Sequence, residues 1–291
     1  MTIIGVGLIG GSIAQALRDQ DLVGRVVGVT RRRETLQTAL DMKVIDEGTA
    51  CAADAVKNSN LIIICTPVRS IVSTVKEIVP NLMHNAVITD VGSVKGNIVR
   101  QCETMMPESC SFVGGHPIAG RERVGVAASF PSLFQGSRTI LTPTSNTPQH
   151  ALALVRLVWE AAGSVVEMMD VDYHDQVLAA TSHLPHLMAY NVVNTLSDLE
   201  EHLRQEVFRY AASGFRDFTR IASSDPTMWR DICLENRDGI LEILKRFQGD
   251  LDHLIQRVDE GDGDALHEMF SRSKTTRDRV LAEHAVLRGD R

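Results

Sequence analysis

Three glycines near the start of the chain have the spacing of a phosphate-binding loop. The segment Gly5-Val6-Gly7-Leu8-Ile9-Gly10 follows a short apolar run and precedes a stretch with helical character. Gly5 permits the tight turn, Gly7 lets the backbone approach a pyrophosphate, and Gly10 lets the helix pack closely on the strand. Free N–H groups at the start of the helix would bind the phosphates. The pattern predicts a dinucleotide site, although a glycine-rich turn without a ligand has the same spacing.

The end of the second expected strand indicates which dinucleotide is bound. An NAD site normally places Asp or Glu there to bind the ribose 2′-hydroxyl, whereas this chain reads Gly28-Val29-Thr30-Arg31-Arg32. Thr30 could donate a hydrogen bond to a 2′-phosphate, and Arg31 or Arg32 could pair with it. The segment favours NADP, with NAD or both cofactors as the alternative and a solvated basic turn as the purely structural explanation. The predicted cofactor site also includes Thr66 and Pro67, which follow the third expected strand.

A histidine-containing segment is the first candidate for the reaction chemistry. Gly114-Gly115-His116-Pro117-Ile118-Ala119-Gly120 follows an expected strand at residues 111–113. The sequence therefore predicts a loop at the carboxyl edge of the sheet, where open α/β folds bind ligands. His116 could act there as a base toward a substrate hydroxyl while hydride leaves the same carbon. A single loop histidine is more often a bystander, so the other motifs decide its interpretation.

Two further motifs carry polar groups that could share this edge. The segment Asp90 to Lys95 closes an earlier strand and brings the Ser93 hydroxyl and the Lys95 amine to it, while His183 and His186 share one face of a later helix. Ser93 could instead cap a helix, and the two histidines could be buried structural residues. The histidine pair lacks a carboxylate or thiolate at ligand spacing, so no metal site is predicted.

Two arginines follow in the second half of the chain. Ser213-Gly214-Phe215-Arg216-Asp217-Phe218-Thr219-Arg220 places two guanidinium groups near a glycine turn. A planar guanidinium suits bidentate binding of a carboxylate, so Arg216 and Arg220 are predicted to bind substrate. Ordinary surface ion pairs are the alternative.

The elements that must position these residues alternate between strands and helices. Apolar runs predict strands at residues 2–4, 26–30, 61–65, 86–90 and 111–113. Helical stretches separate most of them, at residues 12–18, 34–42, 71–79 and 97–102. This alternation predicts an α/β Rossmann domain with a doubly wound, mostly parallel sheet.

The pattern changes after a turn-rich connector at residues 142–148. Beyond it, only residues 164–168 could still pair with the sheet, and from Val171 onward apolar residues recur at helical spacing. We expect a Rossmann domain over residues 1–146 and an all-α domain over residues 147–291. The change falls between about residues 145 and 172.

Composition narrows the class of protein. The 291 residues contain no apolar run near the ~20 residues of a membrane helix, and the first residues lack the features of a signal peptide, so we expect a cytoplasmic protein. A net charge of −7 and 4% aromatic residues argue against a nucleic-acid partner. The five cysteines lack disulfide or zinc spacing and are expected to be reduced.

Taken together, the motifs resemble those of the prephenate/arogenate dehydrogenase family of tyrosine biosynthesis. The resemblance covers almost the whole chain in the family's order, and its segments are 5–10, 90–95, 114–120, 182–186, 214–221 and 225–231. It implies a Rossmann domain followed by a helical dimerisation domain, and hence a homodimer. It also implies oxidative decarboxylation of a cyclohexadienyl acid, with hydride transfer to a nicotinamide.

The resemblance also implies roles for individual residues. His116 would accept the hydrogen bond and proton of the ring hydroxyl, and Ser93 would orient that hydroxyl. Arg220 would bind a substrate carboxylate, while His183 and His186 would line the pocket, His186 near the substrate side chain. One departure is Arg121, which stands where the family usually has Ser or Thr. The other is the missing acid after the second strand.

The choice of substrate depends on one polar contact, because prephenate carries a keto acid side chain and arogenate an amino acid side chain. The second histidine of Ser182-His183-Leu184-Pro185-His186 resembles family members that accept prephenate. We therefore expect prephenate, or both compounds, rather than arogenate alone. A β-hydroxyacid dehydrogenase would need a lysine in the helical domain, but none occurs between Lys95 and Lys245. A cofactor-sensing protein without turnover is the non-enzymatic alternative.

Overall fold

The computed structural model describes residues 1–120 and 123–288. Residues 1–240 form one compact unit, and the residues from Leu241 onward form another. The first unit contains the sheet and all the predicted site residues. Arg121 lies outside the described residues.

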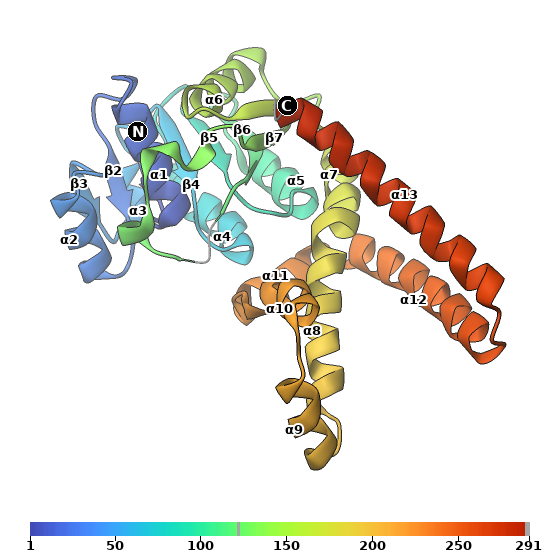
Figure 1. Cartoon of the computed structure of the whole chain (residues 1–291). Helices are drawn as coiled ribbons and strands as arrows, with labels where there is room; N and C mark the ends of the chain where they lie inside the picture. The colour runs from blue at the N-terminus through green and yellow to red at the C-terminus, as the bar shows by residue number, and fades with distance from the viewer. Residues whose placement is uncertain (121–122, 289–291) are drawn as a thin grey trace. The chain divides into compact units, whose positions relative to one another are not determined.

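An eight-stranded sheet is the framework of the first unit (Figure 1). Its order is β3-β2-β1-β4-β5-β6-β7-β8, and all neighbouring pairs are parallel except β6 with β7. The strands are β1 (Thr2–Ile4), β2 (Val27–Val29), β3 (Glu47–Thr49), β4 (Leu61–Ile64), β5 (Val87–Asp90), β6 (Ser111–Ile118), β7 (Arg138–Thr142) and β8 (Val165–Met168). The order turns back on itself between β1 and β4, which is the switch point where doubly wound folds bind nucleotides.

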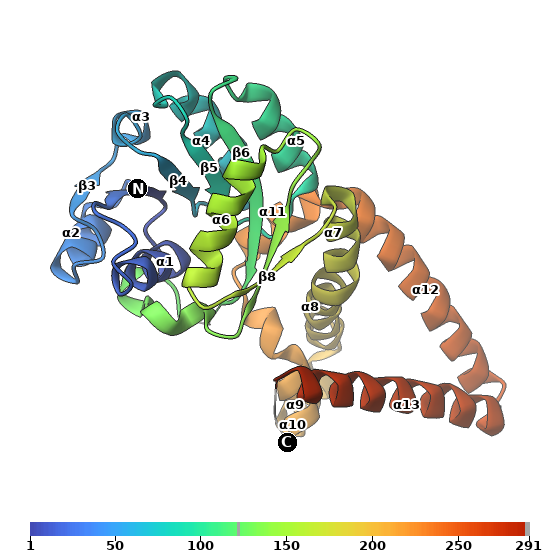
Figure 2. The same ribbon diagram turned by 90° about the horizontal axis from the view of Figure 1, so that it is seen from above.

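Helices cover both faces of this sheet. They are α1 (Leu8–Arg18), α2 (Arg33–Asp41), α3 (Ala52–Ala55), α4 (Val68–Ile78), α5 (Gly96–Met105) and α6 (Gln149–Ala161). Helix α1 packs beside α6 and α4 beside α5, on opposite faces (Figure 2). Every residue of β1 and β4 is buried, which explains why these strands read as continuous apolar runs without alternation. The expected α/β fold with a mostly parallel, doubly wound sheet is confirmed.

The sheet extends further along the chain than the apolar runs indicate. The strand expected at residues 111–113 continues to Ile118, so the segment predicted as a histidine-containing loop is part of β6. That prediction was wrong because Gly114, Gly115 and Pro117 suggested a turn, whereas pairing with β7 keeps the backbone extended. Helix α6 and strand β8 follow residue 146, the expected end of the Rossmann domain, and β8 pairs with β7.

Helices make up the rest of the first unit, as the spacing after Val171 predicts. They are α7 (Val171–Leu178), the π-helical turn η4 (Ala179–His183), α8 (Leu184–Ser197), α9 (Glu201–Arg209), α10 (Ser213–Thr219) and α11 (Pro226–Glu235). Helices α7 and α8 follow one another through η4 without a break in the chain (Figure 1). Helix α12 (Arg237–Asp259) begins in this unit and continues into the second, where a turn at Gly261 leads to α13 (Gly263–Arg288). Among the described residues, no helix combines the length and apolar character that crossing a bilayer requires.

Candidate functional site

The glycine loop joins β1 to α1 at the carboxyl edge of the sheet. Gly5 has φ of +96°, and a Cβ there would lie 2.5 Å from the carbonyl oxygen of Cys65. A Cβ on Gly10 would lie 2.6 Å from the carbonyl oxygen of Gly5. A Cβ on Gly7 would meet no described atom within 4 Å. Two of the glycines therefore shape the loop, while the third leaves open space beside the N–H groups of Leu8 and the rest of the first helical turn.

A buried hydroxyl on the next strand lies close to this loop. Thr66 follows β4, and its Oγ1 is buried without a hydrogen-bond partner among the described residues. A buried polar atom without a partner is costly, so such an atom beside a ligand loop indicates that a ligand or water completes it. Pro67 caps the N-terminus of α4 and is exposed. These residues fit a dinucleotide between the ends of β1 and β4.

The end of β2 carries the residues expected to select the cofactor. Thr30 is half-buried, and its Oγ1 accepts a hydrogen bond from the Arg32 N–H at 3.5 Å. Arg31 and Arg32 are exposed, and Arg32 is the N-cap of α2. A helix N-terminus beside two guanidinium groups can bind an anion such as a 2′-phosphate.

His116 lies beyond the carboxyl end of β5. In β6, pairing with β5 covers residues up to Val113, after which His116 faces Ile140 of β7. The side chain is 9% exposed. Burial, followed by the nearby charges of His174, Lys95 and His183, lowers the pKa of His116 well below its ordinary value. The imidazole is therefore neutral near pH 7 and able to accept a proton.

A chain of hydrogen bonds leads from His116 into α7. Its Nδ1 lies 2.9 Å from Nε2 of His174, whose Nδ1 lies 2.8 Å from Oδ1 of Asp175. The Asp175 carboxylate also accepts the backbone N–H groups of Lys95 and Gly96, each at 2.8 Å. Asp175 therefore caps the start of α5 and supports the imidazole pair. His174 and Asp175 were not predicted from the sequence; a His-Asp pair in the first helix of the helical segment was the available signal.

Lys95 lies inside the protein rather than at an open edge. Its side chain is fully buried, pairs with Asp90 and donates to the Gly115 carbonyl at 2.9 Å. Ser93 is half-buried in the β5–α5 loop, and the N-cap position of α5 belongs to Lys95. Ser93 is therefore not the N-cap of α5, which was the purely structural explanation of this residue. Lys95 is buried and does not reach the open edge of the sheet.

His183 and His186 both contact the indole of Trp229, which belongs to the motif at residues 225–231 but was not predicted as a site residue. The His186 ring stacks on the indole at 3.9 Å between centroids, and the His183 ring meets it edge-on at 6.0 Å. Burial lowers the pKa of His183 to about 4. Burial, together with the charge of Arg220, also lowers the pKa of His186. Both rings are neutral near pH 7.

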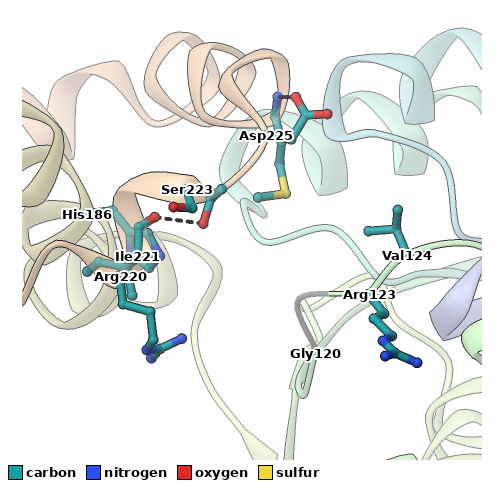
Figure 3. A pocket seen from close by; sticks show the side chains of 10 residues that line it. Gly120, Arg123, Val124, His186, Arg220, Ile221, Ser223 and Asp225 are labelled. Atoms are coloured by element: carbon teal, nitrogen blue, oxygen red, sulfur yellow. Dashed lines mark hydrogen bonds between the residues drawn. The ribbon is translucent and has the colours of Figure 1, made fainter. Parts of the chain in front are cut away.

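A cavity of about 930 Å³ opens beside His186. It is lined by Gly120, Arg123, Val124, His186, Arg220, Ile221, Ser223, Ser224, Asp225 and Met228. Gly120, Arg123 and Val124 lie across the cavity from His186 and Arg220 (Figure 3). The structure thus brings together two of the predicted substrate residues and adds a second cation, Arg123. Arg216 is exposed on α10 and does not line the cavity, and neither do His116, Ser93 or His183.

Two family models match consecutive parts of the chain, and both describe the same family. A family model described as "Prephenate dehydrogenase, nucleotide-binding domain" matches residues 13–168. A second, described as "Prephenate dehydrogenase, dimerization domain", matches residues 170–272.

Individual proteins match over almost the full chain. The cyclohexadienyl dehydrogenase of Zymomonas mobilis is 36% identical over 286 residues, which is 98% of this chain and 97% of that protein. The solved prephenate dehydrogenase of A. aeolicus, in complex with hydroxyphenyl propionate and NAD+, has a TM-score of 0.90 and 39% identity, covering 96% of this chain and 97% of its own. The solved arogenate dehydrogenase of Synechocystis has a TM-score of 0.82 and 29% identity, covering 96% and 99%.

Proposed function

The chain belongs to the prephenate dehydrogenase family, and we propose that it catalyses the oxidative decarboxylation of prephenate, or of both prephenate and arogenate. The observation that carries this proposal is the neutral, buried imidazole of His116 at the carboxyl edge of a Rossmann sheet. A nicotinamide cofactor, when bound at the glycine loop, accepts the hydride from the ring carbon that bears the hydroxyl.

The chain's own residues orient the ring and manage one proton. His116 accepts the hydrogen bond of the ring hydroxyl and takes its proton as hydride leaves; the proton returns to the phenolate oxygen once the ring is aromatic. Loss of carbon dioxide is driven by that aromatisation, so the protein supplies orientation rather than a strong base. Ser93, in the β5–α5 loop, would orient the hydroxyl. Arg220 and His186, which share the cavity wall, would bind the carboxylate and the side chain of the substrate.

We propose NADP as the preferred cofactor. Thr30 can donate to a 2′-phosphate, Arg31 is exposed beside it, and no acid stands where NAD enzymes hold the ribose hydroxyl. The solved A. aeolicus relative contains NAD+, so NAD, or both cofactors, is the alternative. The ratio of kcat/KM for NADP to that for NAD decides between them, and a ratio below one contradicts the NADP assignment.

The substrate preference depends on the side-chain end of the cavity. The Nδ1 of His186 donates to the Ser182 carbonyl at 2.9 Å, so its neutral ring presents a bare Nε2 that can only accept a hydrogen bond and does not by itself favour a keto acid side chain. The relatives support prephenate, or both substrates, over arogenate alone. The Z. mobilis and A. aeolicus proteins, 36% and 39% identical, are named cyclohexadienyl and prephenate dehydrogenase, whereas the arogenate dehydrogenase of Synechocystis is 29% identical. Absorbance assays of nicotinamide reduction with each compound test the choice, and an absence of turnover with prephenate contradicts it.

We also propose a cytoplasmic homodimer formed through the helical half. The second family model is that of a dimerization domain, and α12 carries an exposed apolar row along its length, made up of Leu241, Phe247, Leu251, Ile255 and Val258. Such a row on one helix is typical of a surface that another subunit covers. A mass of about one chain in sedimentation equilibrium at micromolar concentration would contradict the dimer.

The central experiment is the substitution His116→Asn. An enzyme that uses this imidazole as a base should lose kcat by about 100-fold or more, while still binding cofactor with unchanged affinity. His202→Asn is the matched control, since that histidine is exposed on α9. Unchanged turnover in His116→Asn would remove the residue from the mechanism.

A further inference from the structure

Two neighbouring histidines at this site make different hydrogen bonds, and the partners of each bond determine where its proton lies. We propose that Asp175 and Asn236 are positioning residues that hold His116 and His183 in opposite tautomers. His116 presents a bare Nε2 that accepts a hydrogen bond, whereas His183 presents a protonated Nε2 that donates one. This inference deepens the proposed function and rests on it for its catalytic meaning.

The argument starts at Asp175, whose protonation state is set by backbone donors. Its Oδ1 accepts the N–H of Lys95 and its Oδ2 accepts the N–H of Gly96, so both oxygens act as acceptors, as those of an ionised carboxylate do. Burial alone would raise the pKa of Asp175, but the hydrogen bonds from His174, Lys95 and Gly96 lower it below its ordinary value. Asp175 is therefore an ionised acceptor, and the Nδ1 of His174, 2.8 Å away, carries a proton.

The proton on His174 determines the proton on His116. With Nδ1 protonated, a neutral His174 has a lone pair on Nε2. That atom lies 2.9 Å from Nδ1 of His116, so His116 must donate from Nδ1. Its own Nε2 is then bare. The same relay stabilises the imidazolium that forms when this Nε2 takes a proton from a substrate hydroxyl, because the positive charge is linked to the Asp175 carboxylate.

Asn236 determines the tautomer of His183 in the opposite sense. Its Nδ2 lies 2.8 Å from the backbone carbonyl oxygen of Asp175. A carbonyl oxygen can only accept a hydrogen bond, so the Asn236 amide must present its nitrogen, and not its oxygen, at this position. The same Nδ2 lies 3.2 Å from Nδ1 of His183. His183 therefore accepts at Nδ1 and carries its proton on Nε2. That Nε2 is buried and has no hydrogen-bond partner among the described residues. This is expected of a donor whose partner is an oxygen atom of a bound ligand.

The two tautomers match the two kinds of oxygen on a cyclohexadienyl acid. The ring hydroxyl must give up a proton, which the bare Nε2 of His116 accepts. A carboxylate must stay ionised, because carbon dioxide leaves only from the anion. A neutral imidazole N–H such as that of His183 donates a hydrogen bond without transferring its proton. Asp175 takes part in fixing both tautomers. Its side chain is linked through His174 to His116, and its backbone carbonyl is linked through Asn236 to His183.

The tautomers can be measured without turnover, in the full chain labelled with ¹⁵N-histidine, by long-range ¹H–¹⁵N correlation spectra. We expect His116 and His174 in the Nδ1–H form and His183 in the Nε2–H form, assigned from His116→Asn, His174→Gln and His183→Asn. In Asn236→Ala, only the His183 signals should move toward a mixture of tautomers. Asn97→Ala is the control, because it also removes an asparagine amide, one that donates from Nδ2 to Glu235, the residue just before Asn236. An Nε2–H signal at His116, or a doubly protonated His174, overturns the proposal.

Kinetics of two His174 variants separate positioning from packing. Gln keeps an oxygen that can accept from His116 Nδ1, whereas Leu fills similar space without an acceptor. We expect His174→Leu to lower kcat by about 100-fold with substrate KM nearly unchanged, and His174→Gln to recover most of the loss. Equal losses in both variants overturn the positioning role. If the wild-type protein shows the expected tautomers but oxidises neither compound, the proposed function fails while the tautomer assignment stands.

Discussion

The ammonium of Lys95 and the carboxylate of Asp90 form an ion pair in which neither side chain is exposed. Asp90 also accepts the N–H groups of Gly92 at 2.8 Å and Gly115 at 3.2 Å, and Lys95 donates to the Gly115 carbonyl at 2.9 Å. The pair thus ties the end of β5 to β6 at the residue before His116. A buried pair that is also hydrogen-bonded to backbone N–H and carbonyl groups fixes geometry, whatever its net contribution to stability.

The first prediction concerns the loss of one member of this pair. Lys95→Met should lower the free energy of unfolding by about 3–5 kcal/mol, because it leaves the Asp90 carboxylate buried without its cation. Urea denaturation followed by circular dichroism measures the change. Arg100→Ala is the control, since Arg100 pairs with Asp172 on the surface and should cost at most about 1 kcal/mol. Equal losses in the two variants would show that burial of the Lys95 pair has no special effect.

The second prediction concerns the pH dependence of turnover. Burial, then the charges of His174 on α7, Lys95 at the start of α5 and His183 in η4, lowers the pKa of His116. The neutral form is the acceptor, so activity should persist as the pH falls and be lost only when the pH passes the lowered pKa. We expect kcat/KM to stay flat down to about pH 6.5, where a histidine of ordinary pKa would be half-protonated. An acidic limb centred at or above that pH contradicts the prediction.

Two glycines of the loop should respond differently to alanine. A Cβ on Gly7 meets no described atom within 4 Å, so Gly7→Ala should leave the melting temperature unchanged and raise the cofactor Kd about tenfold or more, by occupying space needed by the pyrophosphate. A Cβ on Gly10 lies 2.6 Å from a backbone oxygen and 2.8 Å from the Ile3 side chain, so Gly10→Ala should destabilise the fold by about 1–3 kcal/mol. Calorimetry and cofactor titration measure both effects. The opposite ranking would show that Gly7 shapes the loop.

The elements that sequence predicts well here are those whose pattern is local. Strand β4 was recognisable because a parallel strand covered on both faces is apolar at every position, and β1 was recognisable because the glycine loop follows it. Strands β3 and β7 were not predicted. Glu47-Gly48-Thr49 has no apolar pattern, and Arg138–Thr142 becomes a strand through antiparallel pairing with β6. Such pairing depends on residues far apart in the chain, which no local pattern records.

The site shows the same division between local and distant information. The glycine spacing and the histidines were visible in the sequence, because each motif is contiguous. The link from His116 to His174 was not visible, since these residues are 58 positions apart in the chain. The burial of Lys95 was not visible either, because its backbone and side chain bond to Asp175 and Gly115, which lie on other elements. Arg216 and Arg220 looked equivalent in sequence, but they lie on different sides of the end of α10, and only Arg220 lines the cavity.

The cofactor prediction is tested at the end of β2. Thr30→Asp should lower kcat/KM for NADP and raise it for NAD, because a carboxylate repels a 2′-phosphate and binds a 2′-hydroxyl. Arg31→Ala should lower kcat/KM for NADP by about tenfold and leave the NAD value unchanged. Arg25→Ala is the control, since Arg25 precedes β2 at the opposite end of the strand and pairs with Glu47. Equal changes for both cofactors in Arg31→Ala would show that Arg31 does not read the 2′ position.

The last prediction compares Arg216, within α10, with Arg220, which follows the last residue of that helix. Arg220 lines the cavity with His186, whereas Arg216, exposed on α10, is not one of the residues that line it. A hydrogen-bonded carboxylate–guanidinium contact is worth about 1.5–3 kcal/mol, so Arg220→Ala should lower kcat/KM for the substrate by about 10- to 100-fold. Cofactor KM should not change, because the residues assigned to the cofactor follow β1, β2 and β4. Arg216→Ala is the matched control and should stay within about twofold of wild type. Arg220→Lys should recover only part of the loss, since an ammonium cannot bind both carboxylate oxygens in one plane. If the Arg216 variant falls as far as the Arg220 variant, the cavity does not hold the substrate carboxylate.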